Sequence, residues 1–219
     1  MTYKIVKCLE SMTREHFVVP RVDEREWVRQ QEELAFLFAR PLGMSRWRYV
    51  DTTPDYTRQP EGYKGEYNDL VLVQPPTPKL PFRRILEITG LSFDTDVLKM
   101  RDWSDDKGNF RTPSIVYATW VDDGGRNIGI APSVVRNNLA EGARVGTGLD
   151  GVFLYVADRG VLRRHYLDLP GSEVGSDSAP SLHLWPGGPR FHCDWVDRAF
   201  SHCGSVVAGR KIVTRDLAA

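Results

Sequence analysis

The chain has 219 residues, of which 41% are hydrophobic and 26% are charged, as in ordinary globular proteins that bury their own core. Its 29 basic residues balance its 29 acidic residues, which excludes a strong overall attraction to nucleic acid or to an anionic membrane. The 3 cysteines do not make a disulfide framework, and no stretch has the pattern of a secretory leader or a membrane span. We therefore expect a cytoplasmic protein with free thiols and no membrane partner.

The first predicted elements are a strand and an amphipathic helix. Apolar and polar residues alternate in residues 1–9, which predicts a strand. Residues 23–39 predict a helix, with Asp23 as its N-cap and an apolar face that includes Trp27 and Phe38.

Residues 42–68 are rich in aromatic residues, arginine, proline and glycine and have no steady hydrophobic period. They predict a long loop with one short strand at 47–50. Long loops on a scaffold frequently carry binding surfaces, and aromatic rings beside arginines can stack on bases or sugars. The alternative is that the rings pack in the core and rim of an irregular loop. The candidate binding residues are Trp47, Tyr49, Tyr56 and Tyr63.

The rest of the chain mixes short strands and helices without a regular rhythm. Helices are predicted at 81–90, 132–141 and 147–158. Strands are predicted at 69–73, 97–103, 114–123, 163–169, 182–185, 190–196 and 204–215. The order predicts an α+β fold in a single domain, with a mixed or mainly antiparallel sheet flanked by three to four helices. The polar segment 170–181 is predicted to be a linker before a C-terminal hairpin.

The stretch RVGTGLDGVFLY contains the spacing G-x-G-x-x-G at Gly146, Gly148 and Gly151. This spacing is typical of a dinucleotide-binding turn, in which an acid such as Asp168 would bind the ribose. Such a turn must follow a buried strand, whereas the residues before it, RNNLAEGA, have a helical pattern.

A capping box explains the same stretch without a nucleotide. The side chain of Thr147 can accept from the free N–H groups at a helix start, and Asp150 can bond back to the cap. We therefore predict a capped helix that binds no phosphate, and we interpret Asp168 as a surface or turn acid.

Histidine and cysteine gather in the C-terminal third, where residues 192–193 and 202–203 repeat a His-Cys pair. Imidazole and thiolate are ligands that zinc prefers, although no familiar spacing such as paired C-x-x-C is present. Neighbouring side chains of a strand point to opposite faces, so one ion cannot take both members of a pair. The candidate metal ligands, if there is a metal, are His183, His192, His202 and Cys203, with Asp194 on the same strand face as His192. The favoured interpretation has no metal: a hairpin and a return strand with partly exposed histidines and buried thiols.

Two functional interpretations stay open. The first is a binding or accessory module that recognises a small molecule or a protein partner. The second is a hydrolase or transferase that uses His192, Asp194 and Cys203, or a zinc site in the 183–203 region. Nucleic acid is not expected as a partner, and no cofactor is expected, with zinc as the one alternative. Convergence of these side chains in space would favour the second interpretation, and scatter would favour the first.

From residue 68 to residue 172 the order of features is similar to a family of uncharacterised bacterial proteins, known only as a domain of unknown function. The resembling pieces are NDLVLVQ, PSIVYATWVDDGGRN, ARVGTGLDGVFLYVADRGVL and HYLDLPGS. The chain departs from the family pattern at Gly148 and Leu149 and in its histidine- and cysteine-containing tail. The resemblance implies no activity, but it supports a capped helix at 147–155.

Overall fold

The computed structural model describes residues 23–63, 66–103 and 110–215, so the strand predicted at 1–9 lies outside the described residues. The α-helices of this part are α2 (Glu24–Phe38), α3 (Arg46–Val50), α4 (Phe82–Thr89), α5 (Pro132–Asn137), α6 (Gly148–Ala157) and α7 (Val161–Arg164). Single 3₁₀ turns are η1 (Glu61–Tyr63), η2 (Thr95–Lys99) and η3 (Gly125–Asn127).

The strands of the described residues are β1 (Asp69–Val73), β2 (Ser92–Phe93), β3 (Arg101–Asp102), β4 (Tyr117–Asp122), β5 (Ala143–Val145), β6 (Tyr166–Asp168), β7 (Ser172–Glu173), β8 (Ser178–Trp185), β9 (Gly188–Trp195), β10 (Cys203–Ser205) and β11 (Val207–Thr214). The longest of these strands are β8, β9 and β11, with 8 residues each. Helices and strands occur in no repeating order, which confirms the predicted α+β class.

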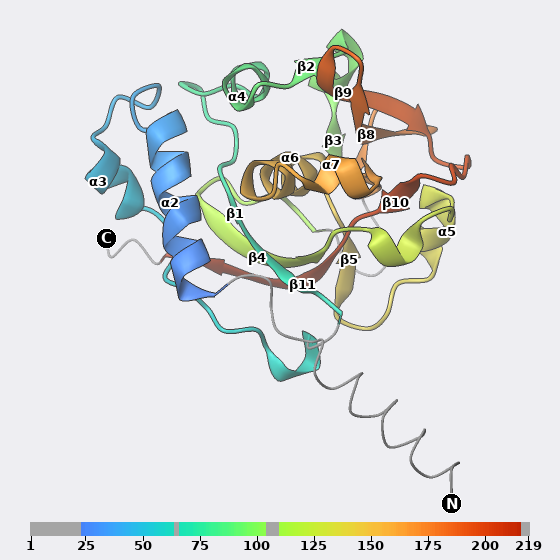
Figure 1. Ribbon diagram of the computed structural model, residues 1–219, viewed down its shortest axis with the longest axis horizontal. Helices are drawn as coiled ribbons and strands as arrows, with labels where there is room; N and C mark the ends of the chain where they lie inside the picture. The colour runs from blue at the N-terminus through green and yellow to red at the C-terminus, as the bar shows by residue number, and fades with distance from the viewer. Residues whose placement is uncertain (1–22, 64–65, 104–109, 216–219) are drawn as a thin grey trace, which may run out of the picture.

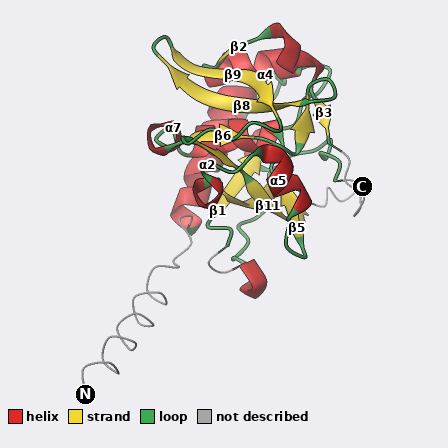
Figure 2. Cartoon of the chain, turned by 90° about the vertical axis from the view of Figure 1, so that its right-hand side faces the viewer, coloured by secondary structure: helices red, strands yellow, loops and turns green. Residues whose placement is uncertain are grey.

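Two sheets organise the fold. One is antiparallel, with strand order β1-β4-β11-β5. The other has the order β10-β6-β8-β9-β2 and is mixed, because β10 pairs with β6 and β2 with β9 in parallel. Figure 2 shows β2, β9 and β8 at one end of the molecule and β1, β11 and β5 at the other.

Helix α6 joins the two sheets, since it contacts β1 in the first and β8 in the second (Figure 1). Its residues Val152, Phe153 and Val156 are buried, as the sequence predicted. Helix α2 covers the outer edge of the first sheet. The buried Gln30 donates to the carbonyl oxygen of Leu70 at 3.0 Å and accepts from the N–H of Leu72 at 3.1 Å. A side chain thereby satisfies backbone groups of an edge strand that would otherwise be left unpaired.

Several predicted elements are confirmed. Asp23 caps α2 by accepting from the N–H of Glu26. Helix α4 ends at Gly90, which has the left-handed φ of 78° that glycine adopts without strain. Strand β1 coincides with the predicted residues 69–73, and the C-terminal hairpin is formed by β8 and β9.

Three predictions need correction. Residues 47–50 are helical and not a strand, because the side chain of Ser45 accepts from the N–H of Arg48 and starts α3. Residues 97–103 are mostly the turn η2 with only the two-residue strand β3. The segment 170–181 is not a free linker, since it contains β7 and the start of β8.

The glycine-rich stretch is a capped helix, as predicted. Thr147 accepts from the N–H of Asp150, whose carboxylate accepts in turn from the N–H of Thr147 at 2.7 Å. The N–H of Gly148 donates to the hydroxyl of Ser172 at 2.9 Å. The preceding strand β5 pairs antiparallel with β11, which is not the parallel context of a dinucleotide turn.

The three glycines of this stretch allow close packing. A Cβ at Gly146, Gly148 or Gly151 would approach a neighbouring side chain to 2.5 Å or less, and none of the three has a left-handed φ. The side chains that fill this space are those of Val206, Met100 and Leu169. The backbone of Gly171 also crosses that of Gly146, and its N–H donates to the Gly146 carbonyl at 2.8 Å. These glycines therefore serve the packing of protein against protein at the start of α6.

A buried ion pair lies under the cap. Arg144 is 2% exposed and Asp150 is fully buried, with 2.5 Å between Nη1 and Oδ2. Arg144 also donates to the hydroxyl of Thr119, and its guanidinium lies 3.9 Å from the ring centre of Phe110. The pair ties β5, β4 and α6 together.

Candidate metal centre

The second sheet has one apolar and one polar face. Leu167, Leu182 and Phe191 are fully buried on the apolar face, which packs into the core. The residues next to them in each strand point the other way, because side chains alternate along a strand. On that polar face the cross-strand register places Asp168 of β6 opposite Ser181 of β8. Ser181 in turn lies opposite His192 of β9.

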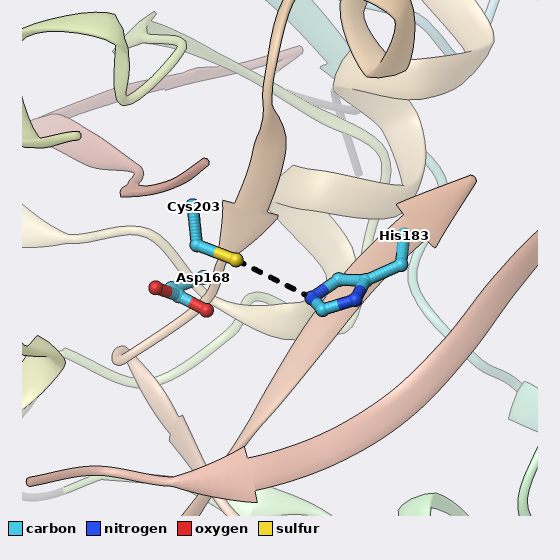
Figure 3. A group of neighbouring side chains, drawn as sticks. All are labelled: Asp168, His183 and Cys203. Carbon is cyan, nitrogen blue, oxygen red and sulfur yellow. Dashed lines mark hydrogen bonds between the residues drawn. The ribbon is translucent and has the colours of Figure 1, made fainter. Parts of the chain in front are cut away.

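The side chains of Asp168, His183 and Cys203 point toward one another from β6, β8 and β10 (Figure 3). Their potential ligand atoms all lie within 4.8 Å of one another. The Cys203 sulfur is 3.6 Å from Nε2 of His183. Three strands that are distant in sequence thus contribute a sulfur, a nitrogen and an oxygen donor to one small volume.

A second group shares His183. His183, His192 and Asp194 also hold their ligand atoms within 4.8 Å of one another. Oδ2 of Asp194 is 3.7 Å from Nε2 of His183 and 3.6 Å from Nε2 of His192. We refer to the five residues of both groups as the donor cluster.

The hydrogen bonds of Ser181 show which side chains of the donor cluster already have a partner. Its hydroxyl donates to Oδ2 of Asp194 at 3.0 Å and lies 3.2 Å from Nε2 of His192. A serine has a single hydroxyl hydrogen, and a carboxylate only accepts. The hydroxyl must therefore accept from His192, which places the proton of that ring on Nε2. His192 consequently has no free lone pair at the atom that faces the cluster.

Burial shifts the pKa values of three side chains of the cluster toward their neutral forms. Burial raises the pKa of Asp168 to about 7, and the charge of Asp194 acts in the same direction. Burial, with Asp168 and Asp194, raises the pKa of Cys203 to about 12. Burial lowers the pKa of His183 to about 4, helped by His192 and His202 and opposed by Asp194. His183 is therefore neutral at pH 7 and keeps a lone pair for an ion.

Two buried polar groups of the same face lack partners. No described group donates a hydrogen bond to the carboxylate of Asp168, which is 3% exposed. The hydroxyl oxygen of Ser205, which lies directly across from Asp168 on β10, is buried and without a hydrogen-bond partner among the described residues. Buried polar groups are normally paired, so these two are exceptions on the polar face of the second sheet.

The predicted site residues converge in part. His183, His192, Asp194 and Cys203 lie together on the polar face. His202 is exposed, and its ring contacts Tyr166 at a centroid distance of 5.1 Å, outside both donor groups.

Two members of the site were not found from sequence. Asp168 is buried in the cluster, so its interpretation as a surface or turn acid is wrong. Ser181 was also overlooked. Both residues alternate with buried leucines, Asp168 with Leu167 and Ser181 with Leu182, which would have placed them on a common face if the pairing of β6 with β8 had been known.

The aromatic residues of 42–68 do not form one surface. Trp47 is 70% exposed on α3, whereas Tyr49 is fully buried and donates to Oε1 of Gln74. Tyr49 is therefore a core residue and is not available to a ligand. Tyr56 and Tyr63 are half-buried and pack against the core.

Cys203 does not meet the requirements of a thiol nucleophile. A nucleophilic cysteine needs an accessible thiol with a lowered pKa, usually next to a positive charge. Cys203 is 1% exposed, and its pKa is raised by burial and by two carboxylates. A bound cation would reverse this, because a metal ion deprotonates the thiol that it coordinates.

Comparison with known proteins adds no relative: the chain matches no protein-family model, and no curated protein or solved structure is significantly similar to it. Among the described residues, no helix combines the length and apolar character that crossing a membrane requires.

Proposed function

We propose that the chain is a zinc-binding protein and that Asp168, His183 and Cys203 hold the ion. The observation that carries the proposal is the convergence of these three donors, with no positively charged side chain among the described residues paired with Asp168. Thiolate, imidazole and carboxylate are the ligand types of protein zinc sites. Three protein ligands leave a fourth position for a water molecule or for Asp194.

The distances support a tetrahedral ion. Zinc–nitrogen and zinc–sulfur bonds of about 2.05 and 2.3 Å imply about 3.5 Å between the two ligand atoms at a tetrahedral angle. The observed distance between Nε2 of His183 and the sulfur of Cys203 is 3.6 Å. These two side chains can take up a zinc ion without a rearrangement of the strands.

The group with Cys203 is favoured over the group with His192 because a single sulfur contact, between Cys203 and Nε2 of His183, is all that engages its donors among the described residues. Nε2 of His192 donates to Ser181, and Asp194 accepts from the same hydroxyl. Asp168 accepts from no described side chain, so an ion there would neutralise a buried carboxylate and displace only the weak contact between Cys203 and His183.

Elemental analysis of protein purified without an affinity tag tests the proposal. We expect near-stoichiometric zinc in the wild type, retained through dialysis. His183→Gln and Cys203→Ser should each lose it. Cys193→Ser is the matched control, because Cys193 is the neighbouring free cysteine and points to the opposite face of β9.

Cobalt substitution supplies a second measurement that does not depend on metal availability during expression. We expect a thiolate-to-cobalt charge-transfer band in wild type and in Cys193→Ser, and none in Cys203→Ser. Wild-type protein that binds neither metal after reconstitution would reject the zinc proposal.

A second candidate, a zinc-dependent hydrolase, is favoured by the position of Asp194 beside the cluster. Its side chain is 25% exposed, so a water in the fourth zinc position would have a carboxylate base on the solvent side. We expect zinc-loaded protein to hydrolyse p-nitrophenyl acetate, and Asp194→Asn to lose the activity while keeping its zinc. Loaded wild type without activity above free zinc rejects this candidate and leaves the binding proposal intact.

A further inference from the structure

A cavity of about 540 Å³ lies apart from the donor cluster, between α4, α6, α7 and the β8–β9 hairpin. This volume is in the range of small-molecule sites. Its apolar lining includes Ile88 of α4, Tyr155 of α6, Leu162 of α7 and Leu184 of β8. Leu184 is 40% exposed, so the cavity presents apolar surface that nothing in the described structure covers.

The charges that line the cavity are all positive. Arg159 and Arg163 contribute guanidinium groups, and no carboxylate occurs among the described residues that line it. The neighbouring cavity beside α2 is different, because there Arg29 is paired with Glu26 and Glu33. The cavity between α4, α6 and α7 therefore has a positive charge that none of its described lining residues neutralises.

Arg159 is held in place at the rim. Its Nη1 donates to the carbonyl oxygen of Thr89 at 2.8 Å, and its guanidinium lies 4.5 Å from the ring centre of Tyr155. Nη2 is 3.7 Å from Oε1 of Glu33. Arg159 therefore holds a positive charge in a fixed position at the rim. Glu33 balances part of that charge.

Arg163 is free to bind. Its side chain makes no hydrogen bond or ion pair to any described residue, and it is exposed. The next residue, Arg164, is paired with Asp158 at 2.8 Å and with Asp123 at 3.2 Å. Two adjacent arginines on one short helix therefore differ: Arg164 is anchored within the fold, and Arg163 lines the cavity with no described partner for its charge.

We infer that this cavity binds a small organic carboxylate with an apolar body. The carboxylate would pair with the guanidinium of Arg163, which matches it in planar, two-point geometry. The apolar part would cover Leu184 and Ile88 and lie against Tyr155. This site shares no residue with the proposed zinc ligands, so it stands independently of the zinc proposal.

Titration calorimetry with 4-phenylbutyrate tests the inference, with 4-phenylbutan-1-ol and 4-phenylbutylamine as neutral and cationic probes of the same shape. We expect the carboxylate to bind at least about tenfold more tightly than the alcohol, because a charge-assisted hydrogen-bonded pair is lost. The amine should not bind measurably.

Variants locate the site. Arg163→Gln should weaken 4-phenylbutyrate binding about tenfold, and Leu184→Ser should weaken it for the alcohol and the acid alike. Arg48→Gln, an exposed arginine on α3, is the matched control and should have no effect. His183→Gln, which should lose the zinc, should keep the affinity within about threefold of wild type, which separates this site from a carboxylate bound to zinc. No measurable binding, equal affinity for acid and alcohol, or an unchanged Arg163→Gln variant would each overturn the inference.

Discussion

The glycine-rich cap of α6 and the donor cluster of the second sheet both resemble ligand sites in sequence, but they differ in how their polar groups are paired. At the cap, the N–H groups of Thr147 and Gly148 bond to Asp150 and Ser172. In the cluster, the buried carboxylate of Asp168 accepts from no described donor. The polar groups of the cap are paired with one another, whereas the cluster keeps a buried carboxylate without a described donor. The cap and the cluster differ in whether their buried polar groups are paired, more than in residue type.

The largest effect should come from breaking the ion pair under the cap. Arg144→Met would leave the fully buried Asp150 without its guanidinium partner. Removal of one partner of a buried pair costs about 3–5 kcal/mol, because the remaining charge is uncompensated. Urea unfolding followed by circular dichroism would measure the loss.

Arg84→Met is the control for that experiment. Arg84 pairs with Glu87 on the surface of α4, at 3.0 Å and with both side chains largely exposed. Exposed pairs contribute about 0.2–1 kcal/mol, so this variant should be close to wild type. Equal losses in the two variants would show that burial of the Arg144 pair does not determine its effect.

A smaller loss should follow from Gly171→Ala. A Cβ there would lie 2.6 Å from the carbonyl oxygen of Val145 and 2.7 Å from that of Gly146, and backbone atoms cannot rotate away. Overpacking of this kind costs about 1–3 kcal/mol. Gly187→Ala should be neutral, since nothing lies within 4 Å of its Cβ position and its φ is not left-handed. If Gly171→Ala is as stable as wild type, then a Cβ fits at this position despite the short distances to the backbone of Val145 and Gly146.

The elements that could be predicted are those fixed by local chemistry. The cap of α2, the left-handed Gly90 and the capping box of α6 each depend on residues within one turn of each other. The short α3 was missed because its aromatic and β-branched residues suit a strand, while one hydroxyl, that of Ser45, starts a helix. Segments of this length have too little periodicity to decide between the two.

The sequence could predict which site residues share a face of one strand, but not which strands lie side by side. Alternation along β9 placed His192 with Asp194 and away from Cys193, as the structure has it. The role of Asp168 could not be found, because it depends on the pairing of β6 with β8 and with β10 in parallel. Non-local register is a property of the whole sheet, and no short pattern carries it.

Metal-free protein should lose stability with rising pH because of Asp168. Its pKa is raised from 3.8 to about 7 by burial, so the folded state holds this proton more tightly than the unfolded state does. The stabilisation is complete below about pH 4 and disappears as the pH rises through 7. Between pH 5 and pH 8 the loss relative to Asp168→Asn should be about 2 kcal/mol. Urea unfolding in the presence of a chelator at each pH would measure it.

Two additions sharpen that measurement. Asp177→Asn, on the exposed turn before β8, should follow the wild-type profile. Saturating zinc should remove the pH-dependent loss in wild type, because the ion neutralises the carboxylate. If Asp168→Asn and wild type have parallel profiles in the chelator, then Asp168 is not the buried unpaired acid of the cluster.

The smallest expected effect couples the cluster to the cavity through β8. His183 and Leu184 are neighbours on that strand and point to opposite faces, the first to the donor cluster and the second to the cavity. An ion that fixes His183 should restrict the strand that forms the cavity wall, and so lower the cost of ordering it around a ligand. We expect saturating zinc to raise the affinity for 4-phenylbutyrate about threefold, by calorimetry. Linkage requires 4-phenylbutyrate to raise the zinc affinity by the same factor, and Cys203→Ser should abolish both changes. Affinity for the carboxylate that is identical with and without zinc would show that β8 is rigid in both states and that the two sites act independently.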